Sequence, residues 1–246
     1  MEQQVNEIVE WLRNQVKDAG LNGLVVGVSG GLDSAVVAHL IQRAFPDNSL
    51  GVKMPIQTST SNLDDADQAI SSCGIDSLTI DLTDTHEVMY SQIKNSLMEK
   101  KEFSEENDQL AGANLRARLR MSTLYTIAAN YNYLVVGTDN AAEWYTGYFT
   151  KYGDGGVDIL PLVEFTKGEV REMATFLGVP DRIVNKVPSA DLWEDQTDET
   201  ELGTTYATID AYLKGEEVPE KDKEIIEAQH RKTAHKRGDV PHFHRS

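Results

Sequence analysis

Apolar runs short enough to be buried strands alternate with helical patterns along most of this chain, and this alternation restricts the fold more than any other sequence feature. The five runs are rich in Val, Leu and Ile and cover residues 24–28, 49–55, 76–82, 133–138 and 158–162. Strands buried on both faces and separated by helices are typical of a parallel sheet covered on both sides. We therefore predict an α/β fold: a doubly wound sheet of about five parallel strands flanked by helices, with a helical C-terminal arm.

The balance of charge argues against two classes of partner. The chain has 23 Lys and Arg against 40 Asp and Glu, a formal net charge of −17. General binding of nucleic acid or of an anionic membrane surface requires a basic face. We expect neither partner, and no apolar stretch approaches the length of a membrane span.

The N-terminus and the cysteine content indicate the compartment. Residues 1–20 are acidic and amphipathic and lack the basic and apolar regions of a signal peptide. Cys73 is the only cysteine, so there is no intrachain disulfide framework, as is usual in a reducing cytosol. We predict a cytoplasmic protein with one domain over residues 1–246, in which Cys73 is a small buried residue at a helix end.

The turn after the first apolar run, SGGLDS at residues 29–34, differs from the common catalytic and phosphate-binding turns. Gly27, Ser29 and Gly31 spell the G-x-S-x-G of a hydrolase nucleophile elbow, but that elbow usually follows several strands. Four of the six histidines lie near the C-terminus, so a partner for a serine nucleophile stays open. Walker A needs Lys where Asp33 stands, and the glycines lack the dinucleotide-binding spacing. A bare turn would not need two glycines and an acid.

The same turn fits an anion-binding site of another kind. Gly30 and Gly31 allow the backbone to approach a phosphate, and Ser29 and Ser34 offer hydroxyl groups. The helix expected from about residue 32 directs its free N–H groups and its positive dipole end into the same space. Asp33 would repel a phosphate unless a cation lay between them, and this indicates Mg²⁺, which favours one or two carboxylates together with phosphate oxygens.

SGGLDS in this position resembles the pyrophosphate loop of the N-type ATP pyrophosphatases, which share a Rossmann-like fold. Further motifs follow along almost the whole chain: NLRARLRM (114–121), VVGTDNAAE (135–143), GYFTKYGDGGVDILPL (147–162), TKGEVR, KVPSADLW, DETELGTTYATIDAYL and a late HKR. Together they resemble the ammonia-dependent NAD synthetases. Ser189 stands where many relatives carry Thr, which preserves the hydroxyl group.

The resemblance implies roles for individual residues. For ATP it implies Gly27, Val28, Ser29, Gly30, Gly31, Leu32, Asp33, Ser34, Thr138, Lys167 and Ser189. For the dinucleotide substrate, deamido-NAD, it implies Arg118, Lys151, Asp158, His235 and Lys236. For Mg²⁺ it implies Asp33 and Glu143. As catalytic residues it implies Asp33 and Lys167.

Several of these side chains also have a purely structural explanation. Glu143 could be an acid that favours a helix dipole, and Lys167 an ordinary lysine near a helix start, although that position is mildly unfavourable for a cation. Arg118 could belong to a solvated face, and a GDGG loop could simply be exposed. His235 and Lys236 could lie in a frayed tail, and Trp193 is better explained by packing than by stacking on a ligand.

The implied reaction activates a carboxylate with ATP. An oxygen of deamido-NAD would attack the α-phosphorus, pyrophosphate would leave, and ammonia would attack the resulting acyl-adenylate to give NAD and AMP. Glutamine as nitrogen donor normally requires a second domain with a cysteine nucleophile. The chain has no room for such a glutaminase or nitrilase domain, so free ammonia is expected. Relatives form homodimers with the substrate at the subunit interface, and we expect the same here.

Three other classes compete with this interpretation. A tRNA-modifying pyrophosphatase would need a basic surface and often more cysteines. A GMP synthetase would not account for NLRARLRM together with GYFTKYGDGG. A non-enzymatic nucleotide-binding stress protein could share the sheet, but it would not need both Asp33 and Glu143, and fold alone does not settle function.

Overall fold

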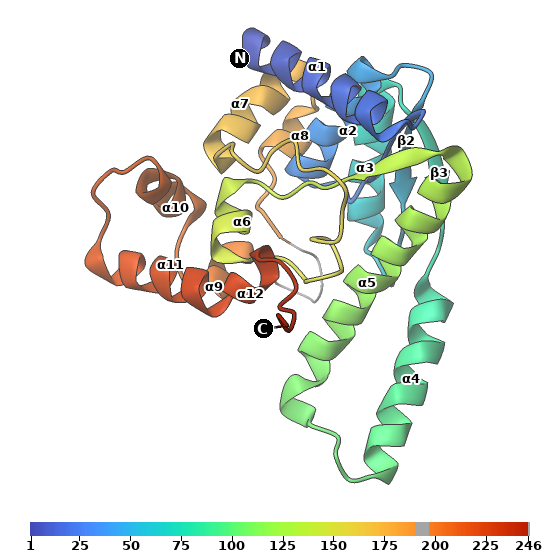
Figure 1. The fold of residues 1–246 in the computed structure, drawn as a ribbon, viewed down its shortest axis with the longest axis vertical. Helices are drawn as coiled ribbons and strands as arrows, with labels where there is room; N and C mark the ends of the chain where they lie inside the picture. Colours follow the sequence, from blue (N-terminus) through green and yellow to red (C-terminus); the bar gives the residue numbers. More distant parts are fainter. Residues whose placement is uncertain (190–196, 246) are drawn as a thin grey trace.

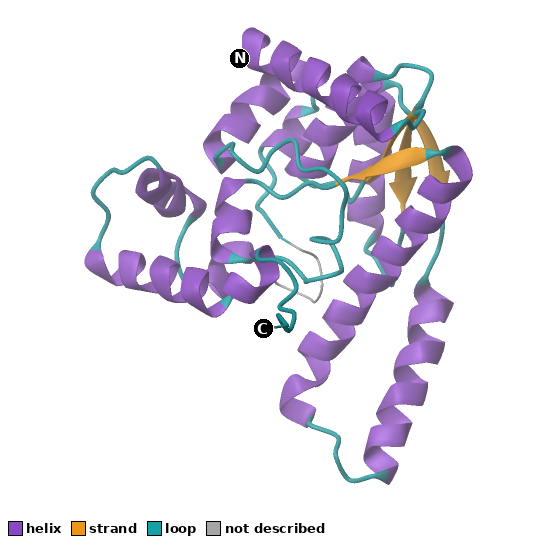
Figure 2. Ribbon diagram, viewed as in Figure 1, coloured by secondary structure: helices purple, strands orange, loops and turns teal. Residues whose placement is uncertain are grey.

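A four-stranded parallel sheet lies at the centre of the described structure, a computed structural model that covers residues 1–189 and 197–245. Its strands are β1 (Gly23–Gly27), β2 (Ser49–Lys53), β3 (Asp76–Thr79) and β4 (Tyr133–Val136), in the order β3-β2-β1-β4. Every pair is parallel, and helices surround the strands (Figure 2). The predicted α/β class with a helix-flanked parallel sheet is confirmed.

The fifth predicted strand is present only in part. Within the described residues, 158–162 meets the sheet through one isolated parallel bridge between Ile159 and Val136. Asp158 begins this segment, and its carboxylate accepts a hydrogen bond from the backbone N–H of Val135. The Asp158 carboxylate therefore occupies a hydrogen-bonding position beside β4 that the backbone of a paired strand would otherwise fill. This limits the pairing to a single bridge.

The two faces of β1 pack against different helices because its side chains alternate. Leu24 and Val26 face a core that includes α1 (Glu2–Ala19), α2 (Leu32–Ala44), α7 (Lys167–Leu177) and α8 (Asp181–Val184). Val25 faces the opposite core with α5 (Glu105–Tyr131). This alternation follows from the two-residue period of a strand, and it explains why β1 reads as a continuous apolar run.

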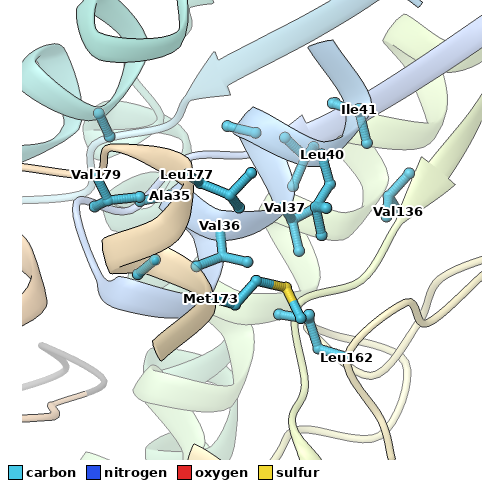
Figure 3. Packing of buried hydrophobic residues seen from close by; sticks show 14 of the residues in the cluster. Ala35, Val36, Val37, Leu40, Ile41, Val136, Leu162, Met173, Leu177 and Val179 are labelled. Atoms are coloured by element: carbon cyan, nitrogen blue, oxygen red, sulfur yellow. The ribbon is translucent and has the colours of Figure 1, made fainter. Parts of the chain in front are cut away.

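Helix α2 is the centre of the larger core. Ten of its thirteen residues are buried, and Val36, Val37 and Leu40 lie with Met173 and Leu177 of α7 in one apolar cluster (Figure 3). A helix buried on nearly every side is fixed at both ends. Its N-terminus, directly after SGGLDS, is therefore a rigid platform for the polar turn.

Helices α4 (Thr83–Glu99) and α5 form a hairpin that extends away from the sheet (Figure 1). The charged segment 101–108 is partly helical, because α5 begins at Glu105. Three acids in the first turn of α5 suit the positive end of its dipole. Asp108 also accepts hydrogen bonds from Tyr90 and Lys94 of α4, so these contacts extend the helix into the charged stretch.

Helix α3 (Thr60–Cys73) is capped by Ser59, whose hydroxyl accepts a hydrogen bond from the backbone N–H of Asn62. Cys73 is the last residue of α3 and is half-buried.

The C-terminal arm is helical, as predicted. It comprises α9 (Asp198–Leu202), α10 (Tyr206–Leu213), α11 (Glu220–Lys232) and α12 (Ala234–Arg237), which gather beside α6 (Ala141–Thr146) (Figure 1). A small apolar core of Ala142, Leu202, Tyr206, Ile209 and Ile226 holds them there. Trp193 lies outside the described residues. No helix in the described part of the chain is long and apolar enough to cross a membrane.

Candidate active site

The SGGLDS turn connects β1 directly to α2 and is held by its own hydroxyl groups. Gly30 has a φ of +83°, which a residue with a side chain rarely adopts. The Ser34 hydroxyl accepts a hydrogen bond from the backbone N–H of Ser29 at 3.2 Å and donates one to the carbonyl of Gly31 at 3.1 Å. The Ser29 hydroxyl accepts from the backbone N–H of Gly31 at 3.2 Å. The turn is thus preorganised at the start of a thirteen-residue helix.

Asp33, the second residue of α2, forms an ion pair with a lysine that lies much later in the sequence. The Nζ atom of Lys167 lies 2.5 Å from Oδ2 of Asp33. Lys167 is the first residue of α7 and is only 3% exposed. Its helix is started by a Thr166–Glu169 capping box, and the carboxylate of Asp210 accepts hydrogen bonds from the N–H groups of residues 167 and 168. Surrounding acids therefore offset the unfavourable position of a cation at a helix N-terminus.

Glu143 completes this cluster from the adjoining strand. It is the third residue of α6, which follows β4, and β4 is the sheet neighbour of β1. Its Oε1 atom lies 3.3 Å from Nζ of Lys167 and accepts a hydrogen bond from the hydroxyl of Tyr206 at 2.9 Å. Asp33 and Glu143 therefore lie close together beyond the carboxyl ends of β1 and β4.

Asn140 joins the two carboxylates and was not singled out from the sequence. Its side-chain oxygen caps α6 by accepting hydrogen bonds from the N–H groups of Ala142 and Glu143. Its Nδ2 donates to Oδ1 of Asp33 at 3.0 Å. The pattern N-x-x-E is the sequence signal of a capping box, so the cap could have been read from the sequence, whereas the contact with Asp33 could not.

The cluster favours the charge of Lys167, whereas burial disfavours the charge of Glu143. Burial disfavours the charged lysine, but the carboxylates of Asp33 and Glu143 outweigh this and raise the pKa of Lys167 above its ordinary value. Burial raises the pKa of Glu143 to about 7, although the charge of Lys167 opposes that change. The ammonium group therefore stays protonated and serves as the counter-ion of both carboxylates.

Two further acidic residues lie around the cluster. Asp198, at the start of α9, accepts a hydrogen bond from the same Tyr206 hydroxyl at 3.0 Å. Asp139 is 5% exposed, and within the described residues its Oδ2 has no hydrogen-bond partner. Burial, reinforced by the charges of Asp154 and Glu143, raises the pKa of Asp139 well above its ordinary value. Neither acid was identified from the sequence, because only the fold places it here.

A second group of expected residues assembles at the other end of α6. Arg118 of α5 donates to the carbonyl of Lys151 at 3.4 Å, and Lys151 donates to the carbonyl of His235 at 2.5 Å. Lys236 donates to the carbonyls of Gly147, at 2.7 Å, and Phe149, at 2.5 Å. Four residues that the resemblance assigned to the dinucleotide thus come together. Helix α6 separates Gly147 from Glu143 by about 6 Å of rise.

The remaining expected residues lie on other segments. Asp158 accepts a hydrogen bond from the hydroxyl of Tyr125, which is about two turns along α5 from Arg118. Thr138 is half-buried and lies two residues after the end of β4, directly before Asp139. Ser189 is exposed and is the last residue described before the gap at 190–196.

Comparison with known proteins decides the family. The family model described as NAD synthase matches residues 4–240. The chain belongs to the NAD synthase family.

Full-length relatives of this NAD synthase family member support the same assignment. The NH(3)-dependent NAD(+) synthetase of Alkaliphilus metalliredigens is 57% identical over 233 residues, which are 95% of this chain and 94% of that protein. An NMN synthetase structure from Francisella tularensis is 38% identical, with a TM-score of 0.89 and 98% of each chain covered. An NH3-dependent NAD synthetase from Campylobacter jejuni is 27% identical, with a TM-score of 0.78 and 99% and 98% coverage.

The central cluster of this NAD synthase family member has donors suited to a hard divalent cation. Oxygen atoms of Asp33 and Glu143 both lie within 3.3 Å of one cationic nitrogen, the ammonium of Lys167. Carboxylate oxygens are the donors that Mg²⁺ prefers, and phosphate and water usually complete its shell. Within the described residues no three His, Cys, Asp or Glu form a complete metal site. The donor set therefore fits a metal that arrives with a nucleotide.

Proposed function

We propose that this chain catalyses the ATP- and ammonia-dependent amidation of deamido-NAD to NAD, with release of AMP and pyrophosphate. One observation carries the proposal: the glycine turn, Asp33, Glu143 and Lys167 meet at the carboxyl ends of β1 and β4. Ligands of open α/β sheets bind in the crevice beyond the carboxyl ends of the strands. The names of the relatives and the family match supply the substrate.

The glycine turn and Lys167 would bind the phosphates of ATP. The free N–H groups at the start of α2 and the backbone of Gly30 and Gly31 provide donors for anionic oxygens. Lys167 takes the role of the lysine that the turn lacks. Because phosphoryl-type transfer depends mainly on positioning and charge neutralisation, these residues need form no covalent bond with the substrate.

Asp33 and Glu143 would hold Mg²⁺ through the oxygens that now face Lys167. Bound there, the ion would neutralise charge on the phosphates as pyrophosphate leaves. Arg118, Lys151, His235 and Lys236 would orient deamido-NAD, since guanidinium and ammonium groups pair with phosphate and carboxylate oxygens. For the reaction, the carboxylate to be activated would have to reach the α-phosphate of ATP in direct contact, so the two ligands would meet at a common point of the site.

Free ammonia is the nitrogen source that fits this chain. A glutamine-dependent route needs a reactive thiolate, and a cysteine becomes reactive when its pKa is lowered. Burial instead raises the pKa of Cys73, the only thiol, which lies at the end of α3. The proposed donor is therefore ammonia itself, either from solution or from a separate protein.

A product assay tests the proposal directly. The purified protein is incubated with ATP, Mg²⁺ and deamido-NAD, with and without ammonium, and the nucleotides are separated by chromatography. NAD and AMP are expected in equal amounts, and NAD only when ammonium is present. Absence of ATP consumption under all of these conditions would rule out the synthetase activity.

The mononucleotide is a second candidate substrate. It is favoured by the likeness to the Francisella tularensis NMN synthetase, which exceeds the likeness to the Campylobacter jejuni enzyme in both identity and TM-score. The relative of highest identity reported above, from Alkaliphilus metalliredigens, carries the NAD(+) synthetase name, so deamido-NAD remains the proposed substrate. Nicotinate mononucleotide offered in competition with deamido-NAD distinguishes the two through the ratio of their kcat/KM values.

The protein is proposed to act as a homodimer that pairs through the α4–α5 hairpin. Helix α4 has one buried residue, His86. Met89, Ile93 and Leu97 are exposed at i, i+4 and i+8, and Leu110 of α5 is 58% exposed nearby in the hairpin. Such a stripe on a projecting hairpin has no partner among the described residues of its own chain. A second copy would cover it, and the substrate site would lie at that interface.

Replacing Ile93 and Leu97 by Glu is expected to convert the dimer into a monomer. Each buried charge would remove apolar contact at the proposed interface, and together they should raise the dimer dissociation constant about 30-fold or more. Light scattering with chromatography measures the change. Gln92→Glu, on the same helix and also exposed, adds a charge as a control and should leave the dimer intact. A wild-type protein that is monomeric and fully active would refute the dimer.

A further inference from the structure

Asp65 is a buried carboxylate outside the two groups described above. Its side chain is 2% exposed, and Ala66 and Ala69 are the other buried residues of α3. It forms ion pairs of 2.7 Å with Nε of Arg182 in α8 and with Nζ of Lys186, just beyond α8. Asp65 is the buried member of these pairs, since the side chains of Arg182 and Lys186 are 50% and 30% exposed. A buried carboxylate is normally paired, and here both of its cations come from α8 or from the residues just beyond it, so the pairing ties that segment to α3.

The backbone around Asp65 lies against the glycine turn. A Cβ atom placed on Gly30 would be 2.9 Å from the Cβ of Asp65 and 2.6 Å from the carbonyl oxygen of Asn62. Helix α3 thus approaches the turn as closely as a glycine permits. Asn62 also accepts a hydrogen bond from Nζ of Lys186 at 2.5 Å. One turn of α3 therefore contacts both the glycine turn and Lys186.

Lys186 leads directly into the segment that carries Ser189. Three residues span at most about 10 Å when extended. Pro188 lies in this short stretch, and its ring fixes its own φ angle. The anchored ammonium therefore limits how far Ser189 can move from Gly30. Arg182 adds a second attachment, because it also donates to the hydroxyl of Ser61 at 3.0 Å.

We infer that Asp65 is a positioning residue for ATP, which fixes the Ser189 segment against the glycine turn through Lys186. The inference rests on the proposed use of ATP by Gly30 and Ser189. Asp65 itself touches no nucleotide in this scheme. The backbone around Asp65 contacts the glycine turn on one side, and its carboxylate holds the segment after Lys186 on the other. The distance between the two halves of the nucleotide site is therefore kept constant.

Asp65→Asn tests the inference, because it keeps the shape of the side chain and removes its charge. The dissociation constant for Mg·ATP, measured by calorimetry without deamido-NAD, is expected to rise about tenfold, as for other outer-shell partners. In turnover, KM for ATP should rise similarly while kcat and KM for deamido-NAD change less than about twofold. The melting temperature should change little, since Arg182 and Lys186 are 50% and 30% exposed and can be hydrated.

Asp67→Asn is the matched control. It lies on the same helix, loses the same charge, and its ion pair with Lys53 is at the surface, with 59% of the Asp67 side chain exposed. Affinity for Mg·ATP should stay at the wild-type value in this variant. Wild-type affinity in Asp65→Asn as well would overturn the positioning role.

Lys186→Met supplies a second, independent measurement. If Asp65 acts through Lys186, the single variants lose similar affinity and the double variant loses no more than either one. Additive losses, or a much larger loss in Lys186→Met, would overturn the inference, and the second result would put the lysine itself on the nucleotide. Since binding is measured without turnover, a wild-type protein that binds Mg·ATP and makes no NAD would contradict the proposed function alone.

Discussion

Asp33→Asn is expected to lower kcat for NAD formation at least about 10³-fold while the fold is kept. Asp33 is proposed to share Mg²⁺ with Glu143, and its charge also balances Lys167 at 2.5 Å. Loss of a group that stabilises charge developing in the transition state typically costs two to three orders of magnitude, and Asp33 would act in this way through the Mg²⁺ that it would hold. Steady-state NAD formation and release of pyrophosphate measure the effect.

Asp84→Asn is the control for Asp33→Asn. Asp84 also lies in the first turn of a helix, α4, but it is exposed and far along the chain from the cluster. That variant should keep wild-type kcat, and both variants should give the wild-type circular dichroism spectrum. Retained adenylation in a natively folded Asp33→Asn would contradict the proposed metal role.

Lys167→Met is expected to lower kcat by about 10³-fold as well, but with a different response to Mg²⁺. Met has a similar length, so the buried site stays filled while the charge on the phosphates is lost. Asp33 and Glu143 then face each other without a counter-ion. Mg²⁺ added without nucleotide should raise the melting temperature of the variant more than that of the wild type, because binding to the folded state stabilises it.

The same variant should have a distinctive dependence of stability on pH. The pKa of Glu143 is already raised to about 7 by burial while Lys167 opposes that change, so removal of Lys167 raises it further. A carboxyl group whose folded-state pKa lies above its unfolded value contributes stability at low pH, and this stability is lost as pH rises through the folded value. The melting temperature of Lys167→Met should therefore fall further below that of the wild type at pH 8 than at pH 5. An equal difference at both pH values, or retained turnover, would show that Lys167 is not the counter-ion of the cluster.

The elements next to the glycine turn were predictable because local pattern and tertiary burial agree there. The run at 24–28 is buried on both faces as β1, and SGGLDS opens α2 as expected. The motifs also identified Asp33, Glu143 and Lys167, although 134 residues separate Asp33 from Lys167 in sequence. Spacing alone carries no information over such a distance, and the family resemblance supplied it.

The features that sequence reasoning missed depend on contacts between distant segments. Asp139 looks like an ordinary loop acid, and the sequence places it near Glu143 but does not show that it is buried. Asp198 looks like a helix-start acid, and only the packing of the C-terminal helices brings it close to Glu143. The start of α5 at Glu105 lies in a charged stretch, and the contacts of Asp108 with α4 that accompany it are outside the local pattern. Asp65 reads as one of several acids in α3, and its burial follows from the position of α8.

The lysine in the central cluster has a consequence for how the protein obtains its metal. A tethered ammonium already pairs with both carboxylates and offsets part of their charge, so folding does not wait for an ion, in contrast to domains that are unfolded without zinc. Chelation during purification should therefore leave a folded, storable protein. Free Mg²⁺ must compete with a cation that is part of the chain and always present, whereas Mg²⁺ carried by ATP brings phosphate oxygens that offer the ammonium a new partner. Nucleotide exchange, rather than metal supply, would then govern when the site becomes loaded.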